Sequence, residues 1–175
     1  GVMTMYQIKN LKSVGLDTGN RTYVIAEIGI NHNGRVETAK ALIDSAVRAG
    51  VDAVKFQTYL TEKRAPEGNA AIFEILKKCE LPFESFRELK LYAETKSVKF
   101  MSTAFDVESL NFLESIDCEV YKLASFDVTN HELLKAVSRT GKTVIMSVGM
   151  ATMEEIKSAY DILRSGTDKI IVLHC

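Results

Sequence analysis

Short apolar runs alternate with amphipathic stretches along most of the chain, beginning at Tyr23. An apolar run of four to eight residues is typical of a buried strand, whereas apolar positions three or four apart predict a helix. Strand-like runs occupy six segments, at about 23–28, 52–57, 98–103, 119–124, 143–148 and 169–174. Their alternation with helical stretches predicts repeated βα units, and hence an α/β protein with a mainly parallel sheet.

Helix boundaries support this reading of the intervening stretches. Gly50 can end a helix after the first strand run, another apolar face follows Pro82, and Asp106 can cap a third helix. Residues 129–132 and 152–155 both have the pattern Thr-x-x-Glu. This capping box, in which each side chain satisfies the backbone N–H of the other residue, predicts helices starting near 130 and 153.

Two segments do not fit the repeat. Residues 1–22 carry short apolar alternation broken by Gly15 and Gly19, which predicts an N-terminal hairpin or a loose lead-in. Residues 60–80 exceed an ordinary connection, so they predict an insertion that forms either a small lid or a packed surface excursion without a role. The remaining residues, 23–175, read as one domain.

Composition narrows the function classes. A chain of 175 residues with 46% hydrophobic content can bury a sizeable core. Its 22 Lys and Arg balance 23 Asp and Glu, which gives no reason to expect nucleic acid or a membrane surface as partner. The absence of a long apolar run and of a signal peptide predicts a cytoplasmic protein. Cys79, Cys118 and Cys175 are far apart, which favours reduced thiols over a disulfide framework or a zinc site.

Two lysines inside predicted strands carry the chemical argument. Strands of a parallel sheet are usually apolar throughout, yet Lys55 and Lys122 interrupt two of them. A buried ammonium is costly unless an anion compensates it. Two at matching strand ends predict an anionic ligand such as phosphate or carboxylate. The alternative is that each lysine pairs with Glu27 or Asp127 only to hold the core.

Small hydroxyl groups occur at the ends of the same strands. Ser102, Thr103, Ser125 and Ser147 each stand at or just after a strand end, where parallel α/β proteins bind phosphate. Together they predict the floor of a pocket.

Carboxylates and a histidine lie near the same strand ends. Glu27, Asp127, Asn31 and His32 could contact a polyhydroxylated substrate or transfer protons. His32 fits equally well as a turn histidine, because Asn-His-Asn-Gly is a good turn sequence.

Five motifs follow one another in residues 23–175: Ala-Glu-Ile-Gly-Ile-Asn-His-Asn-Gly (26–34), Lys-Phe-Gln-Thr (55–58), Met-Ser-Thr (101–103), Tyr-Lys-Leu-Ala-Ser (121–125) and Ser-Val-Gly-Met (147–150). Together they resemble the sialic acid synthase family, which includes N-acetylneuraminate, legionaminate and pseudaminate synthases and their spore-coat polysaccharide relatives. The resemblance implies a TIM (β/α)8 barrel of which this chain holds the first six strands. The last βα units and a C-terminal antifreeze-like domain are then expected beyond Cys175, and the fragment alone is expected to be inactive.

The resemblance also implies a reaction. Such enzymes condense phosphoenolpyruvate with an N-acetylated aldehyde sugar, such as N-acetylmannosamine or a 2,4-diacetamido analogue, to a nine-carbon keto acid and phosphate. A divalent metal, Mn²⁺ or Mg²⁺, is implied as cofactor, with ligands beyond Cys175 and none within this chain, and a homodimer is implied for the full-length protein. The positions expected to bind phosphoenolpyruvate are Lys55, Thr103, Lys122, Ser125 and Ser147, and those expected to be catalytic are Glu27, Gln57 and Asp127.

Two departures from the family pattern bear on the substrate. Many members have Pro at the position of Ala104, and many have Ser-Gly-Glu where this chain has Ser125-Phe126-Asp127. The second change shortens a carboxylate beside the expected sugar, and the Ala-Ser-Phe form favours the legionaminate and pseudaminate branches.

Two other readings compete with a synthase. One is a noncatalytic doubly wound module that binds a phospholigand, and the other is an aldolase with Lys55 or Lys122 as Schiff-base nucleophile.

Overall fold

The computed structural model describes residues 10–19, 21–66 and 68–175, and in these ranges six parallel strands form one sheet in chain order. Each predicted run coincides with a strand to within two residues at either end, which confirms the parallel α/β sheet. The strands are β1 (Ile25–Gly29), β2 (Ala53–Thr58), β3 (Lys99–Ala104), β4 (Val120–Leu123), β5 (Thr143–Ser147) and β6 (Ile170–Leu173).

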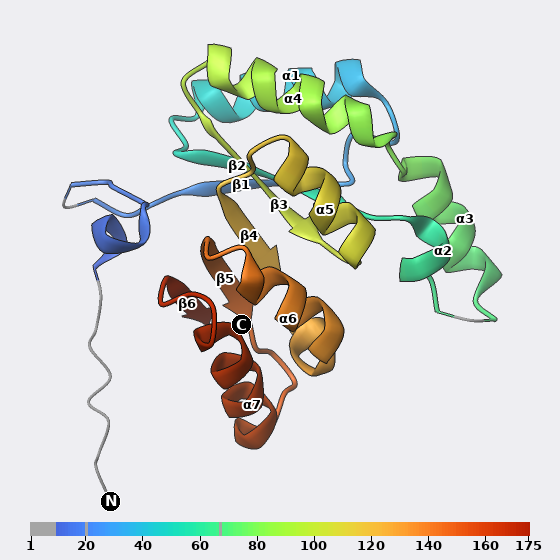
Figure 1. The fold of residues 1–175 in the computed structure, drawn as a ribbon. Helices are drawn as coiled ribbons and strands as arrows, with labels where there is room; N and C mark the ends of the chain where they lie inside the picture. Colours follow the sequence, from blue (N-terminus) through green and yellow to red (C-terminus); the bar gives the residue numbers. More distant parts are fainter. Residues whose placement is uncertain (1–9, 20, 67) are drawn as a thin grey trace, which may run out of the picture.

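The connecting helices pack on one side of the sheet (Figure 1). A strand order that never reverses, combined with right-handed crossovers, keeps every helix on the same face. Neighbouring helices also contact one another: α1 (Val36–Arg48) with α4 (Phe83–Thr95), α5 (Val107–Ser115) with α6 (His131–Arg139), and α6 with α7 (Met153–Arg164). The doubly wound alternative, which needs helices on both faces, does not fit this arrangement.

The two faces of the sheet have different chemistry. Side chains alternate between faces along a strand, so β2 sends Val54 and Phe56 toward the helices and Lys55 and Gln57 to the opposite, inner face. The helix-facing side chains form the main core together with apolar residues of the helices. The inner face is therefore where polar residues can gather without disturbing that core.

The lead-in closes the amino-terminal end of the inner face. In its described part, Leu11–Val14 form a 3-10 helix, η1, in place of a hairpin strand; residues 1–9 lie outside the described ranges. Val14 and Leu16 are fully buried against inner-face residues near the strand starts, namely Ala53, Met101, Val120 and Ile145. The Thr143 hydroxyl donates a hydrogen bond of 2.5 Å to the Val14 carbonyl oxygen.

The two predicted capping boxes have different outcomes. At α7 the prediction is confirmed, since the Glu155 amide donates to Thr152 Oγ1 (3.2 Å) and the Thr152 amide to Glu155 Oε2 (2.8 Å). The helix α6 begins as predicted, but the prediction of a capping box at 129–132 is wrong. Thr129 ends a second 3-10 helix, η2 (Ser125–Thr129), so Asn130, an equally good N-cap residue, caps α6 instead.

The insertion forms two helices, α2 (Thr61–Arg64) and α3 (Ala70–Cys79). The Tyr59 hydroxyl donates to the Leu76 carbonyl oxygen at 2.8 Å, which holds α3 against the end of β2. In Figure 1 the insertion (green) and η1 (blue) lie at opposite ends of β1 and β2. The insertion thus stands at the carboxyl end of the strands. None of the helices in the described ranges is long and apolar enough to cross a bilayer.

Candidate active site

The two strand lysines project from the same inner face. Lys55 is in register with Glu27 of β1, and Lys122 is in register with Thr103 of β3. Both lysines line one cavity of about 340 Å³, together with Glu27 and Ser147. Two ammonium groups therefore converge on a single hollow on the inner face, lined by residues of β1, β2, β4, β5 and β6.

Lys55 has one close counter-ion. Its Nζ forms an ion pair with the Glu27 carboxylate and lies 3.4 Å from Thr103 Oγ1. The side chain of Lys55 is 11% exposed, whereas that of Glu27 is 49% exposed. The structural alternative predicted for Lys55, a pair with Glu27, is thus present. Because the Glu27 carboxylate is half exposed to solvent, it leaves Lys55 accessible, and it can rotate away when an anion binds.

Lys122 has no carboxylate of its own within hydrogen-bonding distance in the described residues. Its Nζ donates to the Leu123 carbonyl oxygen at 2.8 Å. Burial lowers the pKa of Lys122, and the positive charge of Lys55 lowers that pKa further. An anion between the two ammonium groups would relieve both effects, because it offsets the repulsion and replaces lost hydration.

Of three predicted hydroxyl groups, Ser147 lines this cavity, and Thr103 lies beside it through its contact with Lys55. Thr103 and Ser147 are buried at the ends of β3 and β5, and Ser125 begins η2 directly after β4. A hydrogen bond with Ser147 is the main reason that the pKa of Cys175 is lowered, and Ser125 and Lys122 act in the same direction. The Cys175 thiol therefore marks the point at which these groups meet.

Ser102 does not belong to the pocket. It shares a hydrogen bond of 2.8 Å with the Thr58 hydroxyl on the helix-facing side of the sheet. The prediction that it lines the pocket floor is wrong because adjacent strand residues point to opposite faces.

Asp127 and Gln57 each have a buried oxygen without a hydrogen-bond partner among the described residues, Oδ2 and Oε1 respectively. Asp127 is only 4% exposed, and its other oxygen accepts a hydrogen bond of 3.3 Å from Asn130 Nδ2. Burial raises the pKa of Asp127 to about 6, although Asn130 and the charges of Arg64 and Lys122 oppose this rise. Buried polar atoms are rarely left unpaired, so these oxygens point to a ligand.

His32 has the turn role that the sequence allowed. It is 1% exposed, and its Nδ1 accepts a hydrogen bond of 3.1 Å from the Gly34 amide. Asn31 is exposed beside it, in the same turn.

Sequence reasoning missed Arg64. This residue ends α2, and its guanidinium carbon lies 4.0 Å from the ring centre of Phe105. Nothing in the pattern of residues 60–80 distinguishes Arg64 from the neighbouring Lys63, which pairs with Glu108 on the surface. Only the fold shows that one of these two cations turns inward.

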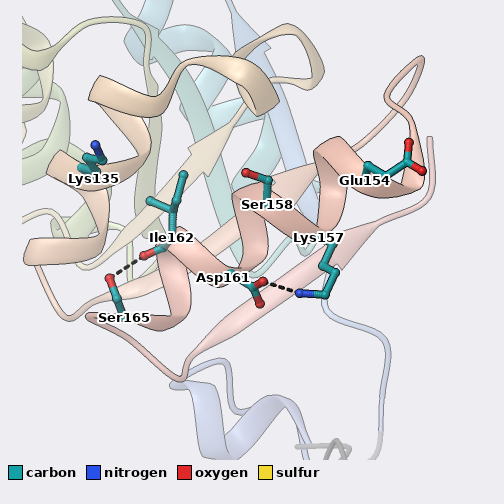
Figure 2. Close-up of a pocket in the computed structure, with 7 residues that line it drawn as sticks. All are labelled: Lys135, Glu154, Lys157, Ser158, Asp161, Ile162 and Ser165. Atoms are coloured by element: carbon teal, nitrogen blue, oxygen red, sulfur yellow. Dashed lines mark hydrogen bonds and ion pairs between the residues drawn. The ribbon is translucent and has the colours of Figure 1, made fainter.

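A larger hollow lies on the outer side of the molecule and has a different character. Figure 2 shows this groove of about 630 Å³, which only residues of α6, α7 and the end of α7 line. Lys157 pairs with Asp161 at 2.5 Å, and the Ser165 hydroxyl donates to the Ile162 carbonyl oxygen at 2.7 Å. Two of the interactions of the groove thus stay within α7 and its end. No strand end contributes to it, so the inner-face cavity is the better candidate site.

The described residues do not by themselves fit the divalent metal that the family resemblance implies. No three His, Cys, Asp or Glu side chains in the described ranges are grouped so that they could hold a metal ion. The location of metal ligands beyond Cys175 stays a prediction.

Comparison with protein families gives a match over most of the chain. The model of the NeuB family matches residues 42–175. Among curated proteins, an uncharacterized protein of Methanocaldococcus jannaschii is 41% identical over 158 residues, which is 90% of this chain and 47% of that protein. The N,N'-diacetyllegionaminic acid synthase of Campylobacter jejuni is 34% identical and is matched over 89% of this chain and 51% of its own length.

A solved structure agrees with these sequence matches. The N-acetylneuraminic acid synthetase of Leptospira borgpetersenii superposes with a TM-score of 0.86 at 38% identity, over 89% of this chain and 54% of that one. The chain therefore spans about half the length of the relatives it matches.

Proposed function

The chain belongs to the NeuB family, and on that premise we propose that the complete protein condenses phosphoenolpyruvate with an N-acetylated aldehyde sugar to give a nine-carbon keto acid and phosphate. The names of similar proteins, a diacetyllegionaminic acid synthase and an N-acetylneuraminic acid synthetase, support this reaction class. The observation that carries the proposal is the convergence of Lys55 and Lys122 on one inner-face cavity.

The proposed role of the lysines follows from charge. Phosphoenolpyruvate carries a carboxylate and a phosphate, and Glu27 supplies the only close carboxylate to the two ammonium groups in the described residues. The substrate anion would compensate Lys122 and compete with Glu27 for Lys55. Thr103, Ser125 and Ser147 would donate hydrogen bonds to its oxygens, as is usual where parallel strands end.

Asp127 is the proposed proton carrier. A carboxyl group with a pKa of about 6 exchanges protons readily near neutral pH. In the condensation, C3 of the enol forms a bond with the aldehyde carbon, and the aldehyde oxygen takes a proton. Water then adds at C2 and gives up one proton, the C–O bond to phosphate breaks, and the hydroxyl left at C2 becomes the keto group as its proton leaves with phosphate. Asp127 would donate the proton to the aldehyde oxygen, and Glu27 and Gln57 would position the sugar hydroxyls.

We further propose that the six strands are an arc of a TIM (β/α)8 barrel in the complete protein. Three features support this: the unreversed strand order, the helices on one face, and the polar groups on the inner face. Active sites of such barrels lie at the carboxyl ends of the strands, and the cavity extends to Ser147 and Leu173, the last residues of β5 and β6.

Phosphate release from phosphoenolpyruvate tests the reaction. The complete gene product should release one phosphate per keto acid formed when N-acetylmannosamine or 2,4-diacetamido-2,4,6-trideoxyhexose is present, and none when both are left out. Binding of phosphoenolpyruvate without release under any acceptor would instead indicate the noncatalytic module. Trapping of a pyruvate adduct on Lys55 or Lys122 by borohydride would indicate the aldolase.

A further inference from the structure

Asn130 joins η2 to α6, and its backbone is fixed on both sides. Its amide donates a hydrogen bond of 2.9 Å to the Asp127 carbonyl oxygen, and its own carbonyl oxygen accepts one of 2.9 Å from the Leu134 amide. The start of α6 is anchored in the core, since Leu133 and Leu134 are 1% and 0% exposed. A residue held in this way directs its side chain with little freedom.

The side chain of Asn130 makes two hydrogen bonds of opposite sense. Its Oδ1 accepts from the Leu133 amide at 3.2 Å, which caps α6, and its Nδ2 donates to Asp127 Oδ1 at 3.3 Å. Of the preferred N-cap residues, Asn alone carries its acceptor and its donor on separate atoms. Because the Leu133 amide needs an oxygen as partner, the Nδ2 group is the one that faces Asp127.

The bond from Asn130 makes the two carboxyl oxygens of Asp127 different. Oδ1 accepts the hydrogen bond from Asn130, whereas Oδ2 is buried and has no partner in the described ranges. An oxygen that already accepts an N–H is the poorer place for the acid proton, because two hydrogens would then compete for the same side of the oxygen. The proton of the neutral acid therefore belongs on Oδ2, the oxygen that is left for a ligand.

We propose that Asn130 is a positioning residue, whose side-chain amide caps α6 and at the same time holds Asp127 Oδ1, so that Asp127 presents its proton from Oδ2 to the aldehyde oxygen. This inference rests on the proposed function, in which Asp127 donates that proton. Asn130 neither gains nor loses a proton, and it acts only through Asp127.

The groups that act on the Asp127 carboxyl are few. Burial raises its pKa, while the hydrogen bond from Asn130 and the charges of Arg64 and Lys122 lower it. A donor stabilises the charged form of a carboxyl group. Removal of the Asn130 donor should therefore raise the pKa of Asp127 further, while Arg64 and Lys122 act as before.

The elements packed against η2 leave this balance unchanged. They are β5, α6 and α7, of which β5 has no charged side chain. The charged side chains of α6 are exposed, and so are those of α7 apart from Glu155, which bonds to the N-cap Thr152. Neither Glu155 nor the half-buried Tyr160 is among the groups that shift the pKa of Asp127.

A capping role alone makes a different prediction. Ser and Asp are as good at an N-cap as Asn, so Asn130→Ser and Asn130→Asp both keep α6 capped. The serine is too short to hold Asp127 as well, and the aspartate puts a second carboxyl group in place of the donor. If Asn130 were only a cap, both variants would behave like the parent.

The test is the pH dependence of kcat for phosphate release by the complete gene product. Phosphoenolpyruvate is saturating, and the acceptor is whichever of N-acetylmannosamine and 2,4-diacetamido-2,4,6-trideoxyhexose the parent uses. A second readout needs no turnover: the Asp127 carboxyl carbon is titrated by NMR in protein labelled with carbon-13 aspartate. Its signal is identified by its absence from Asp127→Asn.

Asn10 offers matched controls. Its Oδ1 accepts from the Ser13 amide at 2.9 Å and caps η1, near the strand starts and away from Asp127. Asn10→Ser and Asn10→Asp therefore repeat the two substitutions at another N-cap, and both readouts should stay as in the parent.

The expected shift is toward higher pH. Because the acid form of Asp127 gives the proton, kcat should fall above its pKa, and a raised pKa moves this fall upward. For Asn130→Ser, the fall in kcat and the NMR titration should both move up by about 0.5 to 1 pH unit, the equivalent of one hydrogen bond. For Asn130→Asp they should move by more than about one unit, because the two carboxyl groups repel each other when charged.

The rate below the fall reports the orientation of Asp127. In Asn130→Ser this plateau value of kcat should drop by about 3- to 10-fold, since one hydrogen bond no longer fixes the carboxyl group. The KM for phosphoenolpyruvate should stay within about twofold of that of the parent.

Three results would overturn the inference: an NMR titration of Asn130→Ser equal to that of the parent, an unchanged plateau kcat in Asn130→Ser, or a shift in Asn10→Asp as large as that in Asn130→Asp. Asn130→Thr, which also caps a helix, replaces a variant that does not fold. A shifted NMR titration with an unmoved pH profile, or no phosphate release by the parent, would refute the proposed role of Asp127 or the proposed function. Both are failures that the NMR readout distinguishes from loss of the Asn130 contact.

Discussion

Replacement of Asp127 by asparagine should make the protein more stable at neutral pH and leave it nearly unchanged in acid. Burial raises the pKa of Asp127 from 3.8 to about 6, which outweighs the opposing effects of Asn130, Arg64 and Lys122. The folded state therefore binds this proton more tightly than the unfolded chain does. Protonated Asp127 contributes stability below the unfolded pKa, and this contribution is lost as the pH rises toward 6.

The magnitude follows from the shift. A change of about two pKa units at about 1.4 kcal/mol per unit is worth about 3 kcal/mol at most. The amide introduced by Asp127→Asn is a neutral isostere of the protonated acid, so the stability gain of the variant should grow from about zero near pH 4 to about 3 kcal/mol near pH 7.5. Urea unfolding of both proteins at several pH values measures the difference.

Asp161→Asn is the control for this series. It removes an exposed carboxylate from α7, and it should change the free energy of unfolding by less than about 0.5 kcal/mol at any of these pH values. A difference between parent and Asp127→Asn that stays constant from pH 4 to pH 7.5 would refute the reasoning, because Asp127 would then have an ordinary pKa.

Two further predictions concern the cavity and the insertion. Lys55→Met and Lys122→Met should each raise the KM for phosphoenolpyruvate about 100-fold or more, because each removes one positive charge from a site for a dianion. Lys99→Met is the control and should have little effect, since the Lys99 amine pairs with the Glu119 carboxylate at the start of β3. Gly34→Ala should destabilise the protein by about 3 kcal/mol or more, because Gly34 has φ +72° and an added Cβ would lie 2.3 Å from a backbone carbonyl oxygen of α3. Gly50→Ala, at φ +77° with nothing within 4 Å, should cost only about 1 kcal/mol.

Steady-state kinetics and urea unfolding check these two predictions. An unchanged KM for phosphoenolpyruvate in both Lys55→Met and Lys122→Met would refute the proposed anion site. Equal destabilisation by Gly34→Ala and Gly50→Ala would show that the contact between the Asn-His-Asn-Gly turn and α3 is not as tight as the structure has it.

The periodic features were the ones that sequence could predict. Apolar runs mark all six strands because a parallel strand is buried on both faces, and the capping box at Thr152 depends only on neighbouring residues. The box at Thr129 failed because η2 occupies that residue, a local choice that tertiary contacts decide. Ser102 was misplaced because the run was read without assigning each residue to a face.

The site was predictable only in part. Lys55 and Lys122 stood out because a charge inside an apolar run is rare, and the structure places both amines in one cavity. Arg64 carries no such signal, since an arginine in a polar connection is ordinary. Its inward direction depends on Tyr59 and Phe105, which come from two different strand ends and meet only in the folded chain.

Val14 and Leu16 cover the end of the inner face that lies near the strand starts. Arg64 and Phe126 stand at the opposite end, so a small molecule that approaches the two amines from the carboxyl ends of the strands passes these two side chains, and whatever forms there passes them again when it leaves by that end. Substitution of Arg64 or Phe126 should therefore alter how fast molecules arrive and depart, even where Lys55 and Lys122 are unchanged.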